Sequence, residues 1–317
     1  MAKYLFYRVV YSIPLFFLIS LIVFSIIHLI PGDPVELFLS DSSAAGDKAM
    51  IEDLRRQLGL DKPIPVQYYN WIKGIFQGDL GKSIRSGYPV TQEIWLRFPA
   101  TLYLTILSLL FAMLIAFPAG ITAAVNRNTK KDYLAMILAL IGISIPGFWA
   151  GIILILTFAL KLQWLPSFGY ESFFTHPLMS LKFMMLPTIT LGAEIAGSLT
   201  RMIRSTLIDE LGKDYVKTAK AKGLPRRNVI LKHVLRNALI PTTTTLGIQF
   251  GRLLGGTAVI ETVFAYPGVG RYVVQAIYDR DYLVVQGVLL ITAVLYVVIY
   301  LSLDIIYKIL DPRIKLK

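Results

Sequence analysis

Cysteine is absent from this sequence, which excludes disulfide bonds, thiolate metal sites and cysteine nucleophiles. Only three histidines are present, His28, His176 and His233, and they lie far apart along the chain. No spacing of histidines and carboxylates typical of a metal site or of an acid, base and nucleophile group occurs. The sequence therefore predicts that this chain is not an enzyme and binds no metal or cofactor.

Charged residues are also scarce, at 16% of 317 residues against about 25% in an average soluble domain. A helix that crosses about 30 Å of hydrocarbon needs about 20 apolar residues. Six runs meet this need, at residues 9–30, 103–125, 135–160, 184–203, 238–260 and 283–306. We therefore expect an all-α, multi-pass membrane protein. The first run is too long for a signal peptide and is interpreted as a retained helix.

The chain carries 32 Lys and Arg residues against 20 Asp and Glu residues, a formal charge of +12. Most of the basic residues lie at the two termini and in two loops that fall on the same side of the membrane, namely around residues 127–131 and 201–236. The positive-inside rule then places both termini in the cytoplasm. The basic surplus indicates topology and gives no reason to expect nucleic-acid binding.

The expected division is a first transmembrane helix at 1–30, an external loop at 31–102, a five-helix core at 103–306 and a cytoplasmic tail at 307–317. Apolar spacing predicts short helices near 47–58 and 66–77 within the external loop. The second of these either lies along the outer membrane surface or packs within a small loop domain. The sequence GDLGKS at 78–83 resembles the end of a phosphate-binding loop, but Phe76 stands where that motif requires glycine. Any ATP is therefore expected on another chain.

Glycine and proline interrupt several of the spans. The third span contains Ser144-Ile145-Pro146-Gly147, which predicts a kink, with a hinge as the alternative. In the fifth span a glycine recurs at every fourth position, and small residues at this spacing let another helix approach closely. These helix-packing candidates are Gly247, Gly251 and Gly255.

Ionisable side chains within hydrocarbon are costly and tend to face a bundle interior or an aqueous path. Glu194 in the fourth span and Arg252 in the fifth are the deepest such residues. They either line a translocation path or pair with each other as a buried contact. Glu261 is expected nearer the interface, within reach of water.

The cytoplasmic loop at 201–237 has a readable local design. We expect Asp214 to cap a short helix that ends at Gly223, where a left-handed turn is favoured. Pro225 suits the first turn of the next helix. Lysines form one stripe on the short helix, which suits either a cytoplasmic protein partner or anionic lipid.

Residues 214–241, DYVKTAKAKGLPRRNVILKHVLRNALIP, resemble the cytoplasmic EAA loop of binding-protein-dependent ABC importer permeases, in the dipeptide, oligopeptide and nickel branch. Further matching stretches are HLIPGDP, LGLDKPIPVQY, GDLGKSI, ETVFAYPGVGR and DPRI. Lys217 stands in place of the glutamate of the general motif, and Arg236 in place of its proline. Both departures are similar to those of the peptide branch.

This resemblance implies a type I importer permease fold with six spans, in a bacterial or archaeal inner membrane. It implies ATPase coupling through Asp214, Tyr215, Val216, Lys217, Thr218, Ala219, Lys220, Ala221, Lys222 and Gly223. The implied partners are a second homologous permease, two ATPase subunits that use ATP and Mg, and an extracytoplasmic solute-binding protein. The implied substrates are di- or oligopeptides, with nickel or a nickel chelate, glutathione and opine-like solutes as alternatives. An ATP-independent secondary transporter is the alternative of a different class.

Overall fold

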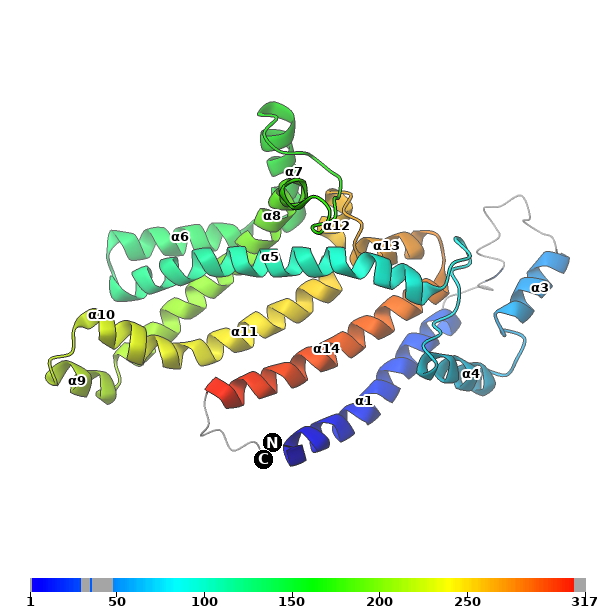
Figure 1. Cartoon of the computed structure of the whole chain (residues 1–317), viewed down its shortest axis with the longest axis horizontal. Coiled ribbons are helices and arrows are strands. Elements are labelled where there is room, and N and C mark those ends of the chain that lie inside the picture. Colours follow the sequence, from blue (N-terminus) through cyan, green and yellow to red (C-terminus); the bar gives the residue numbers. More distant parts are fainter. Residues whose placement is uncertain (1, 30–34, 36–47, 311–317) are drawn as a thin grey trace. The chain divides into compact units, whose positions relative to one another are not determined.

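The computed structural model describes residues 2–29, 35 and 48–310. Over these residues the protein consists of helices joined by loops, with one isolated β-bridge between Lys82 and Pro89 and no strands (Figure 1). The expected all-α fold is confirmed. The α-helices are α1 (Ala2–Leu29), α3 (Lys48–Gln57), α4 (Ile64–Phe76), α5 (Val90–Val125), α6 (Lys130–Ser144), α7 (Gly147–Leu154), α8 (Pro177–Leu211), α9 (Asp214–Ala221), α10 (Arg226–Asn228), α11 (Leu235–Gly256), α12 (Ala258–Val263), α13 (Val269–Tyr278) and α14 (Tyr282–Leu310). Two π-helical segments are η1 (Ile155–Lys161) and η2 (Val229–Val234).

Four of the described helices are long and apolar enough to cross a membrane, at Phe6–Ile26, Val90–Val125, Pro177–Leu211 and Tyr282–Leu303. The pair Lys130–Ser144 and Gly147–Lys161 raises this to five when it is taken as one bent span. The expected fifth span corresponds to α11, whose 22 residues reach about 33 Å at 1.5 Å per residue. Its threonines, Gln249 and Arg252 keep its hydropathy below that of the other spans.

The third span is interrupted at the expected position, Ser144 to Gly147, but the break is much sharper than a kink. α6 and the helical segment after it meet at an angle of 98°. Pro146 has no backbone N–H, and Ile145 before it adopts an extended conformation with φ −81° and ψ 123°. In contrast, Pro118 and Gly120 leave α5 unbroken.

The chain forms two compact units, Met1–Pro99 with Pro267–Val298 and Ala100–Tyr266 with Ile299–Lys317. The expected boundary at residue 102 therefore falls inside α5, and residues 267–298 group with the external segment. Residues 30–34, 36–47 and 311–317 of the predicted loop and tail lie outside the described residues.

In the first unit, the GDLGKS stretch has a structural explanation. Ser83 Oγ donates a buried hydrogen bond of 2.6 Å to Asp281 Oδ2, at the start of α14. Gly81 has φ +86°, and its N–H donates to Asp79 Oδ1 at 2.8 Å. These contacts tie the loop before α5 to the start of α14 within this unit.

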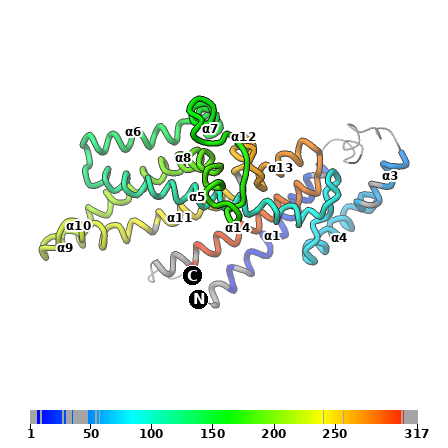
Figure 2. The backbone as a smooth tube through the Cα atoms, turned by 45° about the horizontal axis from the view of Figure 1, so that its top comes forward, coloured from blue at the N-terminus to red at the C-terminus, as the bar shows by residue number. Residues whose placement is uncertain are grey.

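In the second unit, α8 is the central helix and contacts α6, α7, α11 and α12 (Figures 1 and 2). Its buried face consists of apolar residues spaced one turn apart, and this face forms much of the core: Leu191, Ile195, Leu199, Ile203 and Leu207. Small residues let the backbones of α6 and α8 approach closely. A Cβ on Gly142 would lie 2.8 Å from the carbonyl oxygen of Ala193.

The α6–α8 contact yields a stability prediction. Gly142→Ala forces a methyl group against a backbone oxygen that cannot rotate away, so we expect a loss of about 1–3 kcal/mol in unfolding free energy. Gly212→Ala is the control, because a Cβ there meets its nearest atom at 3.5 Å. Thermal unfolding of both purified variants, followed by tryptophan fluorescence, measures the difference. Equal melting temperatures would contradict the close approach.

Candidate coupling loop and membrane ion pair

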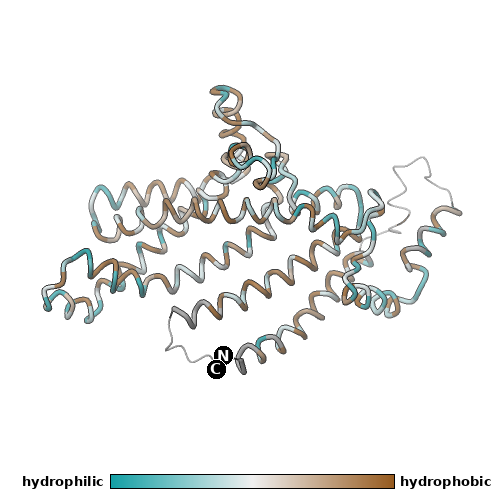
Figure 3. Tube along the Cα trace, in the orientation of Figure 1, coloured by the Kyte–Doolittle hydropathy of each residue, from teal (hydrophilic) through white to brown (hydrophobic). Residues whose placement is uncertain are grey.

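The predicted short helix is present as α9, Asp214–Ala221, between α8 and the segment that leads into α11. Figure 3 shows hydrophilic residues concentrated around α9 and α10, in contrast to the mostly apolar helices on either side. The predicted cap at Asp214 is wrong. Lys213 occupies the N-cap position without a side-chain cap, and Asp214 Oδ1 instead accepts a 2.8 Å hydrogen bond from Lys217 Nζ.

The corner after α9 has the predicted left-handed geometry. Gly223 has φ +76°, and its N–H donates to the carbonyl of Lys220 at 2.9 Å. Leu224 N–H donates to the carbonyl of Ala219 at 3.3 Å, which completes the turn. Pro225 follows as the N-cap residue of α10. A Cβ on Gly223 would meet nothing within 4 Å, so the conformation alone requires glycine here.

Two buried residues fix one face of α9. Val216 is 0% exposed and Ala219 is 8% exposed, and both belong to the core of the second unit. Lys217 and Lys220 lie on the exposed side of the same helix, and Lys222 is exposed directly after it. α9 is therefore a helix with one anchored face and one basic face open to a partner.

A hydrogen-bond cluster around Glu210 anchors α9 to the end of α8. Tyr215 Oη donates to Glu210 Oε2 at 2.6 Å, Lys213 Nζ bonds Oε1, and Asn237 Nδ2 contacts Oε2 at 3.5 Å. Burial, with a further contribution from Glu210, raises the pKa of the Tyr215 hydroxyl. The hydroxyl therefore stays protonated and able to donate at neutral pH. Sequence reasoning missed this cluster because the contact depends on the turn at Gly212 and Lys213.

The structure brings Glu194 of α8 and Arg252 of α11 together. Arg252 Nη2 donates to Glu194 Oε1 at 2.7 Å, and the two side chains remain 57% and 33% exposed, in that order. The expected alternatives were a path or a buried contact. The pairing is present, but it is not buried in this chain.

The three glycines of α11 have different surroundings. A Cβ on Gly247 would collide with the side chain of Leu303 in α14, so a second helix does approach there. Gly251 is buried and Gly255 is exposed. Glu261, expected near water, is fully buried and accepts hydrogen bonds from Thr101 at 2.8 Å and Thr257 at 2.7 Å.

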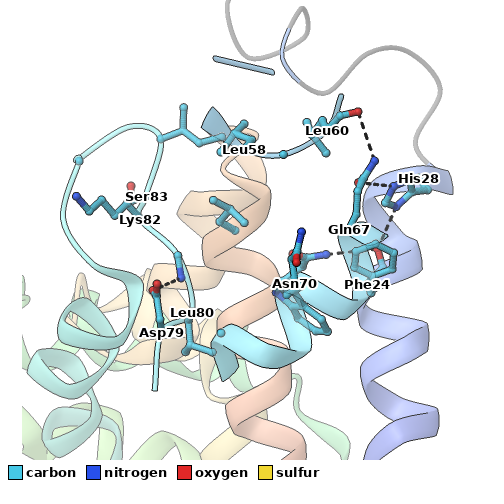
Figure 4. A pocket seen from close by; sticks show the side chains of 18 residues that line it. Phe24, His28, Leu58, Leu60, Gln67, Asn70, Asp79, Leu80, Lys82 and Ser83 are labelled. Carbon is cyan, nitrogen blue, oxygen red and sulfur yellow. Dashed lines mark hydrogen bonds between the residues drawn. The ribbon is translucent and has the colours of Figure 1, made fainter. Parts of the chain in front are cut away.

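A cavity of about 610 Å³ lies in the first unit (Figure 4). Several of its polar side chains hold its own walls together. His28 Nε2 lies 3.2 Å from Gln67 Oε1, and Gln67 Nε2 donates to the carbonyls of Leu60 and Lys62. None of the predicted coupling or path residues lines it. Over the residues that the structure describes, no cluster of three or more His, Asp or Glu side chains is suited to a metal ion.

Comparison with known proteins identifies similar sequences and folds. Residues 116–316 match the family described as binding-protein-dependent transport system inner membrane component, and residues 1–105 match the N-terminal family of such membrane components. Glutathione transport system permease proteins GsiC of Escherichia coli and Pectobacterium atrosepticum are each 42% identical, over 100% of both chains. The inward-facing MetNI methionine ABC transporter, in a native crystal form, has a similar fold, with 22% identity, a TM-score of 0.57, and coverage of 69% of this chain and 96% of that chain.

The Glu210 cluster yields a prediction about local stability. Tyr215→Phe removes a hydrogen bond to a charged group, worth about 1.5–3 kcal/mol, so the amides of α9 should exchange with solvent at least about tenfold faster. Lys217→Ala is the control, because the side chains of its ion pair are 73% and 92% exposed and such pairs contribute little. Hydrogen exchange read by mass spectrometry measures both. Unchanged protection in Tyr215→Phe would show that the cluster does not anchor α9.

Proposed function

The chain belongs to the binding-protein-dependent transport system inner membrane components, and we propose that it carries short peptides, glutathione among them, across the cytoplasmic membrane. It is a non-catalytic permease subunit of an ABC importer and a multi-pass inner membrane protein. ATP hydrolysis lies in partner subunits, and a solute-binding protein delivers the substrate. Full-length similarity to glutathione permeases supports glutathione as the first substrate to test, ahead of nickel chelates and opine-like solutes.

The observation that carries the mechanism is the anchored α9 with its left-handed corner. Its buried face and the Glu210 cluster fix it to α8, and the segment after Gly223 leads directly into α11. A push on the exposed face of α9 therefore reaches both membrane helices. We assign the ATPase contact to residues 214–223, with two ATPase subunits and a second, homologous permease completing the transporter.

The proposed topology places both termini and α9 in the cytoplasm. The concentration of Lys and Arg around 127–131 and 201–236 supports this orientation. In the transport cycle, ATP-driven closure of the ATPases moves α9, and the two membrane states differ in which side the substrate site faces. The free-energy difference between these states is supplied by contacts that α9 makes in only one of them.

Gly223 provides the test of coupling. Gly223→Val should leave membrane insertion and subunit assembly intact but reduce binding-protein-stimulated ATP hydrolysis by at least about tenfold, because a β-branched residue is disfavoured at positive φ. Gly223→Asn is the matched control, since asparagine tolerates the left-handed region and should retain most activity. The measurement is ATPase activity and glutathione uptake by the reconstituted complex. Normal coupled transport by the valine variant would overturn the proposed corner.

A further inference from the structure

α8 has a second face that differs from its buried one. Polar residues recur there at spacings of four, three and four, and each of them is partly or fully exposed: Glu194, Ser198, Arg201 and Ser205. The apolar residues that recur at every fourth position from Leu191 to Leu207 form the buried face. The same helix therefore packs through one side and presents a polar strip on another.

The exposed face of α6 shows what a lipid-facing surface looks like in this chain. After its first turn, which carries Lys130, Lys131 and Tyr133, the large exposed residues of α6 are apolar, at 49–59% exposure: Leu134, Ile137, Leu138, Leu140 and Ile141. Glu194 and Ser198 lie well inside the expected fourth span, where a charged side chain would be costly against lipid, and Arg201 and Ser205 continue the strip to its cytoplasmic end. The strip on α8 is therefore suited to water or a polar solute.

The ion pair at one end of this strip has spare binding capacity. Arginine has five N–H donors and a carboxylate has about four acceptor positions. A single hydrogen bond of 2.7 Å joins Arg252 to Glu194, and 57% and 33% of the two side chains stay exposed. A ligand with both an ammonium and a carboxylate could pair its ammonium with Glu194 and its carboxylate with Arg252. The two protein side chains would then separate without either charge being left unpaired.

We propose that the polar strip of α8 lines the translocation path and that Glu194 and Arg252 form a binding site for zwitterionic solutes. Glu194 accepts the substrate ammonium and Arg252 binds the carboxylate. This inference rests on the proposed importer function and deepens it, because it defines the substrate class as solutes with a free amino group and a free carboxylate. Short peptides and glutathione both meet this condition.

The absence of cysteine makes the path directly testable by single-cysteine labelling. The probe is a charged, membrane-impermeant methanethiosulfonate applied to the whole complex in nanodiscs. Ser198→Cys should react at least about a hundredfold faster than the lipid-facing control Leu138→Cys, because thiolate formation needs water. Ser205→Cys, at the cytoplasmic end of the strip, is the positive control for labelling. Alanyl-alanine should slow the reaction at Ser198→Cys.

Either of two results would overturn the path assignment. Ser198→Cys could react as slowly as Leu138→Cys, or a second permease could crosslink to Ser198→Cys and exclude the reagent in every nucleotide state. Both results leave the coupling assay on Gly223 unaffected. Failure of this inference is therefore distinguishable from failure of the proposed function. The proposed function fails if the unmodified complex shows no nucleotide-dependent transport.

The zwitterion site has its own test, with the binding protein omitted so that its selectivity does not interfere. Alanyl-alanine, its N-acetyl form and its amide are the probes, and binding to the complex in nanodiscs is measured by scintillation proximity. Arg252→Gln should weaken alanyl-alanine binding by about tenfold and leave binding of the amide unaffected. Glu194→Gln should weaken binding of the probes with a free amino group, alanyl-alanine and its amide, and leave binding of the N-acetyl form unaffected. Thr206→Ala on α8 is the control, because the Thr206 hydroxyl donates to the carbonyl of Met202 in its own helix. Equal effects on all three probes, or none, would contradict the assignment.

Discussion

The second unit depends on one constraint, the close approach of backbones around α8. A Cβ on Gly142 would lie 2.8 Å from the carbonyl oxygen of Ala193, and a Cβ on Gly120 would lie 2.8 Å from the side chain of Ile203 and 3.1 Å from the carbonyl oxygen of Thr200. Within a membrane there is little hydrophobic gain from bringing two helices together, so close van der Waals contact through small residues must supply the attraction. Because α8 is held in this way on its apolar side, its polar side does not need to contribute to packing. The proposed path role of α8 is therefore compatible with its place in the core.

The same constraint explains how α9 can act on the membrane helices. Asp132 on α6 receives two hydrogen bonds from Arg204 on α8, one of them 2.7 Å long, near the end of α8 that leads to α9. Glu210, at the same end of α8, then accepts a hydrogen bond of 2.6 Å from the Tyr215 hydroxyl of α9. These contacts link α9 to α8 and, through Arg204 and Asp132, to α6, which is the connection that the proposed coupling requires.

Local chemistry made much of this fold predictable. The corner at Gly223 follows from glycine and proline preferences, and the helices α3 and α4 follow from apolar spacing, because each depends on residues close in sequence. The position of the bend after α6 was predictable from the sequence, but its angle of 98° was not. Pro146 permits a break, but a Cβ on Gly151 of α7 would lie only 3.1 Å from the ring of Phe264 after α12, and this close packing joins segments far apart in the chain. The missed Glu261 site has the same origin, since Thr101 lies far from it in sequence.

The ion pair shows where sequence reasoning stops and geometry begins. From the sequence, Glu194 and Arg252 were two isolated charges, and pairing and path-lining were competing explanations. In the structure they pair while staying exposed, so the two explanations no longer compete. An ion pair that is buried on all sides carries a desolvation cost, and no solute can reach it to take the place of either partner. An exposed pair beside a polar strip can separate and bind a solute, and neither charge is then left without a partner. Exposure, and not pairing, is therefore the property that separates a structural salt bridge from a substrate site on this helix.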